Sequence, residues 1–238
     1  MDNGIYAALT RQSGLMREMR VVANNIANAN TTGFRREGVI FSEHLTPLDR
    51  RGDTLSMANA RGRMVDLHQA VLNQTNGTFD VAIEGEGFFM ISTPEGNRLT
   101  RAGAFMPSAE GELMNADGHR LLDDGGAPII VPAGMGQIAI GPDGTLSAAG
   151  QPIARIGVFA QPPGEDLLHD GGTTFQFSAE PEPMEDARVR QGFLEDSNVD
   201  PVFEISRMIE VQRAYEMGQT FLDREDQRIR SIVSSINR

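Results

Sequence analysis

Three residue types are missing from this 238-residue chain: it contains no cysteine, no tryptophan and, because all 21 of its basic residues are arginine, no lysine. Without cysteine, neither a disulfide framework nor a thiolate metal site can form. Without lysine, Schiff-base chemistry and the phosphate-binding lysine of a P-loop are excluded. Tyrosine occurs only at Tyr6 and Tyr215, which counts against an aromatic platform for sugars.

Long hydrophobic runs are also lacking. The chain has no stretch of about 18 apolar residues, so we expect no membrane-spanning helix. It does not begin with a basic stretch followed by an apolar core, so we expect no cleavable secretory signal. A protein of this kind that leaves the cytoplasm has to be recognised by other means.

The net charge of −12 is concentrated in the middle of the chain. Residues 1–46 hold five Arg and four acids, and residues 187–238 hold eight Arg and nine acids, so the two ends together are neutral. Residues 47–186 hold eight Arg and twenty acids, which is the whole excess. Nucleic acid is a poor partner for such a chain, because phosphate binding needs a basic face.

The N-terminal segment predicts an amphipathic helix. Asp2 or Asn3 can cap it, and Gly33 suits the left-handed position that ends a helix. A heptad stripe with steps of four and three runs along the segment, with Leu15 and Val22 widening it. Its positions are Ile5, Leu9, Gln12, Met16, Met19, Ala23, Ile26 and Asn30.

The C-terminal segment predicts a longer helix. Asp200 is a good N-cap, and Pro201 stands where a first-turn proline is tolerated. About 36 residues would span roughly 54 Å, with Gly218 as a candidate bend. The expected stripe is Ile205, Met208, Gln212, Tyr215, Gln219, Leu222, Asp226, Ile229, Val233 and Ile236. One such helix does not bury enough apolar surface to be stable alone, so we expect neighbouring chains to cover these ends.

The middle of the chain predicts antiparallel β structure, a barrel or a sandwich, because short apolar runs alternate with Gly-rich turns. We expect strands at 79–83, 87–92, 98–105, 112–115, 120–122, 129–131, 137–140 and 154–159. Residues 38–74 are expected to form an extended connection or hairpin with a polar patch at 48–54, and residues 161–187 a return path. The predicted fold class is α+β: terminal helices pairing as a coiled coil, around a central all-β antiparallel domain. The expected boundaries are 1–36, 37–186 and 187–238.

A search for reaction chemistry finds no catalytic, cofactor-binding or metal site. Gly85-Glu86-Gly87 lacks the third glycine of a dinucleotide fingerprint and is better explained as a tight turn. The four histidines, at 44, 68, 119 and 169, lack metal-ligand spacing, and no serine stands in a nucleophile elbow. The chain is therefore not expected to be an enzyme, or to need a cofactor or a small-molecule substrate.

Four blocks carry a resemblance to a known family. They are ANNIANANTTGF at 23–34, DVAIEGEGFF at 80–89 with LTRAGAF at 99–105, GFLEDSNVDP at 192–201 and MIEVQRAYE at 208–216. In this order they resemble the axial proteins of the bacterial flagellum, which include rod, hook and hook-associated proteins. The opening residues and the length look most like a proximal rod protein, with a distal rod or hook protein as the alternative.

The resemblance implies a structural rod component that polymerises through paired terminal helices, with the β domain outside. It implies flagellum-dependent motility, export through the flagellar type III apparatus, and a rod within the periplasm. The implied partners are copies of the chain and other rod proteins. The assembly residues carried over are Ala23, Asn24, Asn25, Ile26, Asn28, Asn30, Thr31, Gly33 and Phe34, with Ser197, Asn198, Val199, Met208, Ile209, Gln212, Arg213 and Tyr215.

Two interpretations from other classes stay open from the residues alone. An acidic β-rich extracellular binding module would be an ordered monomer with exposed aromatic residues. A hydrolase would need a pair of carboxylates, and none is placed to suggest one. If the chain instead orders its ends on assembly, limited proteolysis of the isolated protein should leave a fragment near residues 38–190.

Overall fold

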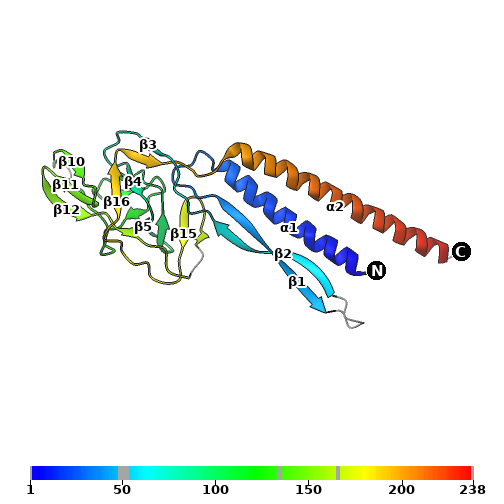
Figure 1. Cartoon of the computed structure of the whole chain (residues 1–238). Helices are drawn as coiled ribbons and strands as arrows, with labels where there is room; N and C mark the ends of the chain where they lie inside the picture. The colour runs from blue at the N-terminus through cyan, green and yellow to red at the C-terminus, as the bar shows by residue number, and fades with distance from the viewer. Residues whose placement is uncertain (1, 48–53, 133, 135, 165–166, 237–238) are drawn as a thin grey trace. The chain divides into compact units, whose positions relative to one another are not determined.

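A computed structural model describes residues 2–47, 54–132, 134, 136–164 and 167–236 (Figure 1). Two helices and a set of antiparallel β-sheets make an α+β fold, which confirms the predicted class at that level. The chain divides into two compact units. The helical unit comprises Met1–Ala27, Glu37–Met64 and Asp200–Arg238, and the β unit comprises Asn28–Arg36 and Val65–Val199.

In the helical unit, helix α1 (Asp2–Ala27) lies against the 36-residue helix α2 (Pro201–Ile236) (Figure 1). The helices are antiparallel: Gln12 contacts Tyr215, and Glu18, further along α1, pairs with Arg207, which comes earlier in α2. Strands β1 (Glu37–Pro47) and β2 (Thr54–Val65) pair as a two-stranded sheet, which confirms the hairpin. The polar patch expected at 48–54 lies, apart from residue 54, outside the described residues.

The start of α2 is as predicted, whereas the end of α1 is not. The Asp200 carboxylate accepts hydrogen bonds from the backbone N–H groups of Val202 and Phe203, at 2.9 and 3.2 Å, so it caps the helix. Helix α1 ends at Ala27 rather than near Gly33. There Asn28 accepts a backbone hydrogen bond and a hydroxyl hydrogen bond from Thr31, and this local bonding replaces the helical pattern.

The predicted helix stripes are wrong in part. On α1, Leu9 is 51% exposed and Ala23 is exposed, whereas Val21, which was not part of the stripe, is buried; Val22 is buried as expected. On α2 the less exposed positions are Glu204, Met208, Val211, Ala214, Tyr215, Gly218, Leu222 and Glu225. Apart from Ala214, they follow the expected stripe with every second position displaced by one residue. Each helix carries apolar residues on two faces, and periodicity alone does not tell which face the partner helix covers. The helix continues through Gly218.

The β unit is built from short strands in four antiparallel sheets. The largest has eight strands, in the order β14-β15-β6-β5-β9-β8-β7, with β13 also paired to β5. The others are β10-β11-β12, β16-β4 and β17-β3. The strands are β3 Leu72–Gln74, β4 Val81–Glu84, β5 Phe88–Thr93, β6 Gly96–Thr100, β7 Met106–Pro107, β8 Leu113–Met114, β9 Arg120–Leu121, β10 Ile138–Ile140, β11 Thr145–Ala148, β12 Gln151–Arg155, β13 Val158–Phe159, β14 Leu168–His169, β15 Thr174–Gln176, β16 Arg188–Gln191 and β17 Phe193–Glu195.

Strand β5 divides the core in two. Phe89 and Ile91 belong to one buried cluster, and Phe88 and Met90 belong to another, as the alternation of side chains along a strand requires. Both faces of this strand are therefore covered, which explains why its sequence reads as a continuous apolar run.

Three strand predictions need correction. The strand expected at 98–105 ends at Thr100. Beyond it, the Gly103 carbonyl accepts a hydrogen bond from the N–H of Val81 at 2.9 Å, and a Cβ at Gly103 would lie 1.6 Å from the Val81 carbonyl oxygen. Residues 129–131 form only an isolated bridge. The return path at 161–187 contains β14 and β15, and Phe175 of β15 is fully buried. Strands of two or three residues are too short to show alternation.

Within the described part of the chain, neither helix is long and apolar enough to cross a membrane.

Candidate functional site

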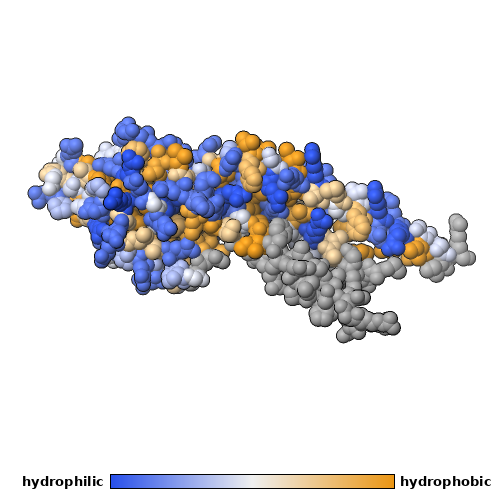
Figure 2. Space-filling view, in the orientation of Figure 1, coloured by the Kyte–Doolittle hydropathy of each residue, from blue (hydrophilic) through white to orange (hydrophobic). Residues whose placement is uncertain are grey.

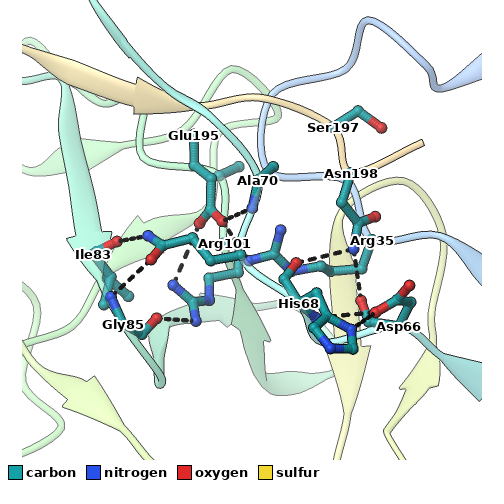
Figure 3. A network of polar contacts seen from close by, with 12 residues as sticks. Arg35, Asp66, His68, Ala70, Ile83, Gly85, Arg101, Glu195, Ser197 and Asn198 are labelled. Atoms are coloured by element: carbon teal, nitrogen blue, oxygen red, sulfur yellow. Dashed lines mark hydrogen bonds and ion pairs between the residues drawn. The ribbon is translucent and has the colours of Figure 1, made fainter. Parts of the chain in front are cut away.

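Residues from both ends of the β unit meet at one place, which we call the junction: residues 28–36, 66–70, 101–102 and 193–199 (Figure 3). Three of these segments belong to blocks that carry the family resemblance. The junction is therefore where the β unit brings together parts of the sequence that are more than 150 residues apart.

A buried carboxylate lies at its centre. The Glu195 side chain is fully buried, and its Oε1 accepts a hydrogen bond from Nη2 of Arg35 at 2.6 Å and from the backbone N–H of Ala70 at 2.9 Å. Its Oε2 accepts one from Nη1 of Arg101 at 3.3 Å. Arg101 also donates from Nη2 to the Gly85 carbonyl, at 2.6 Å (Figure 3). One carboxylate thus holds two arginines from distant segments.

The cluster carries one more positive charge than negative charge. Burial lowers the pKa of Arg101 to about 10; Glu195 opposes this shift, and Arg35 adds to it. The Nε and Nη1 atoms of Arg35 and the Nε of Arg101 are buried without a hydrogen-bond partner. A buried ion cluster of this kind contributes little net stability, but removing one partner is costly because a charge is left uncompensated.

Hydrogen bonds between the Asn198 side chain and backbone groups hold the junction together in addition to the ion cluster. The Asn198 side chain accepts a hydrogen bond from the N–H of Arg36 at 2.6 Å and donates to the carbonyls of Asp66 and His68 at 2.8 and 3.1 Å. The N–H of Asn198 donates to the carbonyl of Phe34 at 3.3 Å. This one amide therefore joins three of the four segments.

Gly33 is required by the close approach of two backbones. Its φ is +73°, and its N–H donates to the Glu195 carbonyl at 2.7 Å. A Cβ at this position would lie 2.3 Å from the backbone nitrogen of Ala102. Gly33 was expected to end a helix, but here it lets the N-terminal segment lie directly on residues 101–102.

An aromatic stack covers the same segment. The ring of Phe34, which is fully buried, stacks on His169 with centroids 5.2 Å apart, and His169 lies 4.4 Å from Phe175. The Nε2 atom of His169 is 3.1 Å from the Arg35 carbonyl oxygen. Edge strand β14 is thus fixed to the N-terminal segment.

A second amide acts inside the helical unit. Asn25 near the end of α1 is fully buried, and it forms two hydrogen bonds of 2.9 Å with the backbone N–H and carbonyl of Glu37 at the start of β1. This paired bond fixes the hairpin to the helix.

The expected assembly residues fall into three groups. Those in the junction are Asn28, Thr31, Gly33, Phe34, Ser197, Asn198 and Val199. Those half-buried or buried in the helical unit are Asn25, Ile26, Met208 and Tyr215, and Tyr215 accepts a hydrogen bond from Gln12 at its backbone carbonyl. Those on exposed surface are Ala23, Asn24, Asn30, Ile209, Gln212 and Arg213.

Arg35, Arg101 and Glu195 were not among the expected residues. Charged residues are ordinarily assigned to the surface, and these three are far apart in the sequence. A signal was present, since each lies within or next to one of the family-like blocks: Arg35 follows Phe34, Arg101 is in LTRAGAF, and Glu195 is in GFLEDSNVDP.

The described part of the β unit has no arrangement typical of catalysis. A cavity of about 440 Å³ adjoins Arg101, and its other lining residues include Glu86, Phe88, Pro162 and Met184 but no nucleophile beside a base. Among the described residues, no group of three or more His, Asp or Glu side chains could hold a metal ion. The residues of the junction join segments of the chain to one another.

Three protein families match the sequence. Residues 5–35 match a family described as "Flagella basal body rod protein". Residues 82–148 match "Flagellar hook protein FlgE/F/G D1 domain", and residues 190–235 match "Flagellar basal body rod FlgEFG protein C-terminal". These ranges contain Asn25, Arg101 and Glu195.

Curated proteins match over nearly their full length. The chain is 37% identical to a protein named flagellar basal-body rod protein FlgF from Caulobacter vibrioides, covering 100% of this chain and 99% of that one. It is 38% identical to a FlgF from Mesorhizobium japonicum, covering 91% and 90%. It is 29% identical to a FlgG from Bacillus subtilis, covering 98% and 99%.

Proposed function

The chain belongs to the family of flagellar basal-body rod proteins, and from this premise we propose that it polymerises through its terminal helices in the proximal part of the rod. It is a structural component of the flagellar basal body and not an enzyme. Three relatives named FlgF are 36–38% identical to it and two others 30–31%, whereas three named FlgG are 29–30% identical. The higher identities among these relatives support the FlgF type.

The observation that carries the proposal is the exposed apolar surface of α2. Val202, Phe203, Ile205, Ile209 and Met217 are each 46–72% exposed, although α2 already has a partner helix on another face. In Figure 2, apolar residues (orange) lie among hydrophilic ones (blue) on the visible side of the helices. Burying the exposed part of each side chain would contribute roughly 1 kcal/mol. A row of such residues marks a protein interface.

The arrangement proposed for the rod follows from these helices. The α1–α2 pair acts as a coiled coil in an inner tube, and the β-rich domain lies outside it. In this arrangement the domain boundaries are 1–36, 37–186 and 187–238, and residues 1–36 and 187–238 together form the inner helical domain. In support, the less exposed positions of α2 follow heptad spacing from Glu204 to Glu225.

The proposed partners are copies of this chain and other proximal and distal rod proteins, together with the flagellar type III export apparatus. The rod so formed would act as the drive shaft across the periplasm, with export independent of a cleavable signal peptide. The neutral charge of the two ends supports close packing of the helices, since the excess of acids lies in the middle segment.

The proposal is tested with Ile209→Asp, because Ile209 is exposed and its substitution leaves the α1–α2 contact intact. A charge buried at this position lacks a partner, so we expect the critical concentration for polymer formation to rise at least about tenfold. Sedimentation and electron microscopy of the full chain measure this, and swimming of a strain carrying only the variant measures motility.

The matched control is Gln227→Asp, which adds the same charge at an exposed polar position of α2. It should assemble and support swimming as the natural chain does. Normal polymer formation and normal swimming with Ile209→Asp would refute assembly through this face.

A further inference from the structure

The last part of the β unit, residues 188–199, contacts most of the other parts of that unit. Strand β16 pairs with β4 and β17 pairs with β3, and each pair is a separate two-stranded sheet (Figure 1). Within the described part of the chain, β3 and β4 have no other strand as a partner. We call residues 188–199 the closing segment, because it completes pairs that begin more than 100 residues earlier.

The closing segment also completes the larger of the two buried clusters. Val189 is 3% exposed and lies in the cluster that contains Val81 and Ile83. Its backbone N–H donates to the Pro142 carbonyl at 2.9 Å. Without Val189 a cavity would open in this cluster, and a cavity in a packed core is destabilising.

Polar groups of the closing segment satisfy backbone groups of earlier segments. The Gln191 side chain accepts a hydrogen bond from the N–H of Ile140 at 3.1 Å and donates to the Thr78 carbonyl at 2.8 Å. The Gly192 carbonyl accepts a hydrogen bond from the N–H of Thr75 at 2.8 Å. In the absence of the segment these backbone groups would need water as a partner, which a folded β unit supplies only at its surface.

Glu195 makes the closing segment necessary for charge balance. Among the described contacts it is the only carboxylate bound to Arg35 or Arg101, whose side chains are 0% and 3% exposed (Figure 3). Of the three guanidinium nitrogens of Arg35, only Nη2 has a hydrogen-bond partner, and that partner is Glu195. Folding of the earlier segments without Glu195 would bury two guanidinium groups that lack a counter-ion, which is strongly unfavourable.

We propose that folding of the β unit is conditional on the closing segment. Residues 28–36 and 65–187 do not hold their fold without residues 188–199, and the whole unit forms and opens together. The inference concerns a single chain, so it goes beyond the proposed function and does not depend on assembly.

The place of the closing segment in the chain delays folding during synthesis. The chain emerges with its N-terminus first, and Arg101 precedes Glu195 by 94 residues. At about 5–20 residues per second, about 5–19 s pass between the synthesis of Arg101 and that of its carboxylate partner. The emerging β unit stays unfolded over this interval.

The alternative is a closing segment that detaches by itself. Parts of a protein often open locally while the rest stays folded. Here local detachment would leave Arg35 and Arg101 buried without their carboxylate, and β3 and β4 without their partner strands. Opening of the segment should therefore spread through the whole β unit.

Native-state hydrogen exchange of the full-length chain distinguishes the two cases. Each reporter is a backbone N–H that donates a hydrogen bond of 2.7–3.0 Å: Val189 and Gly192 in the closing segment, and Leu113 and Leu122 near β8 and β9. We expect equal protection factors at all four positions, with the same dependence on urea, because they exchange through one opening.

A matched pair of variants tests the part played by the carboxylate. Glu195→Gln should lower the protection factors of all four reporters by the same ratio, about a hundredfold or more. The control is Glu95→Gln, because Glu95 is 76% exposed and pairs with Arg98 at the surface. It should lower them by less than about fivefold.

The natural chain decides the question even if Glu195→Gln is too unstable to measure. Weaker protection at Val189 and Gly192 than at Leu113 and Leu122 would show that the closing segment detaches by itself, and it would overturn the inference. A loss of protection in Glu195→Gln that is confined to the closing segment, or no larger than in Glu95→Gln, would overturn it as well. Each of these results would leave the proposed function in place, since none depends on polymer formation.

Discussion

Replacing Glu195 by Gln should destabilise the β unit far more than its single negative charge suggests. The variant keeps the size of the side chain and an oxygen that can accept the hydrogen bond from Ala70. It leaves Arg35 and Arg101 buried without a carboxylate. Breaking a buried pair in this way costs about 3–5 kcal/mol. Against a typical total of about 5–15 kcal/mol, that is a large share of the stability.

The measurement is urea unfolding followed by far-ultraviolet circular dichroism, because the chain lacks tryptophan and its two tyrosines lie in the helices. With a slope of about 2 kcal/mol per molar urea, the midpoint should fall by about 1.5–2.5 M. The control is Glu95→Gln, since Glu95 is 76% exposed and 3.6 Å from Arg98. Exposed pairs contribute about 0–1 kcal/mol, so the control should shift the midpoint by less than about 0.5 M.

A further variant separates charge imbalance from lost packing. Replacing all three members of the cluster, Arg35, Arg101 and Glu195, by Met removes every buried charge at similar volume. Such replacements are often neutral or stabilising, so this variant should recover much of the stability lost in Glu195→Gln. Equal midpoint shifts for Glu195→Gln and Glu95→Gln would refute the reasoning, because the carboxylate would then not balance the buried arginines.

Three shorter predictions follow from the same unit. Limited proteolysis should leave a core retaining residues 28–36 and 191–199, wider than the 38–190 fragment expected from periodicity, and mass spectrometry of its ends decides between them. A non-glycine residue in the left-handed region costs roughly 1–2 kcal/mol of folding free energy. Gly118→Ala should lose only this amount, because the space around Gly118 is open, whereas Gly33→Ala, at a similar φ, should lose more because its Cβ would meet the backbone of Ala102. The midpoints of urea unfolding compare the two variants. Hydrogen bonds from the side chains of Arg98 and Gln176 lower the pKa of Asp170. Its contribution to the free energy of unfolding is therefore present above about pH 4 and is lost as the pH falls further. Asp170→Asn should reduce the loss of stability that the natural chain shows on acidification.

Local chemistry in the sequence predicted those features that depend on adjacent residues. Asp200-Pro201 fixed the start of α2, since a capping carboxylate and a first-turn proline act within one turn. Short apolar runs between turn residues predicted β5 and β9. The same reasoning failed at β14 and β15, because two or three residues cannot display a period. Strand β15 also pairs with β6, which lies about 70 residues earlier in the chain, and β14 pairs with β15.

The candidate site was predicted less completely. Asn25 of the asparagine-rich block and Asn198 of the C-terminal block were expected at the assembly interface, and both satisfy backbone groups within one chain. Their contacts with other chains stay a prediction. Whether the exposed members of the set, such as Ile209, contact other chains stays a prediction. The Arg35–Glu195 pair spans 160 residues, so no local pattern could indicate it. The spacing of residues in the sequence predicts which side chains share a face of one helix or strand, whereas the junction is formed by residues from four separate segments.

The β unit and the helical unit are stabilised by different contacts, and this difference determines which unit gains most from assembly. The β unit buries two apolar clusters and a centrally placed carboxylate, so its junction is complete within one chain. The helical unit leaves Ile209, Ile229 and Ile232 of α2 exposed, and the buried Gln12 Oε1 has no hydrogen-bond partner. Contacts from other chains can therefore add the most stability to the helical unit. Under the proposed function, the β unit folds before polymerisation and the helices gain their remaining stability as they assemble.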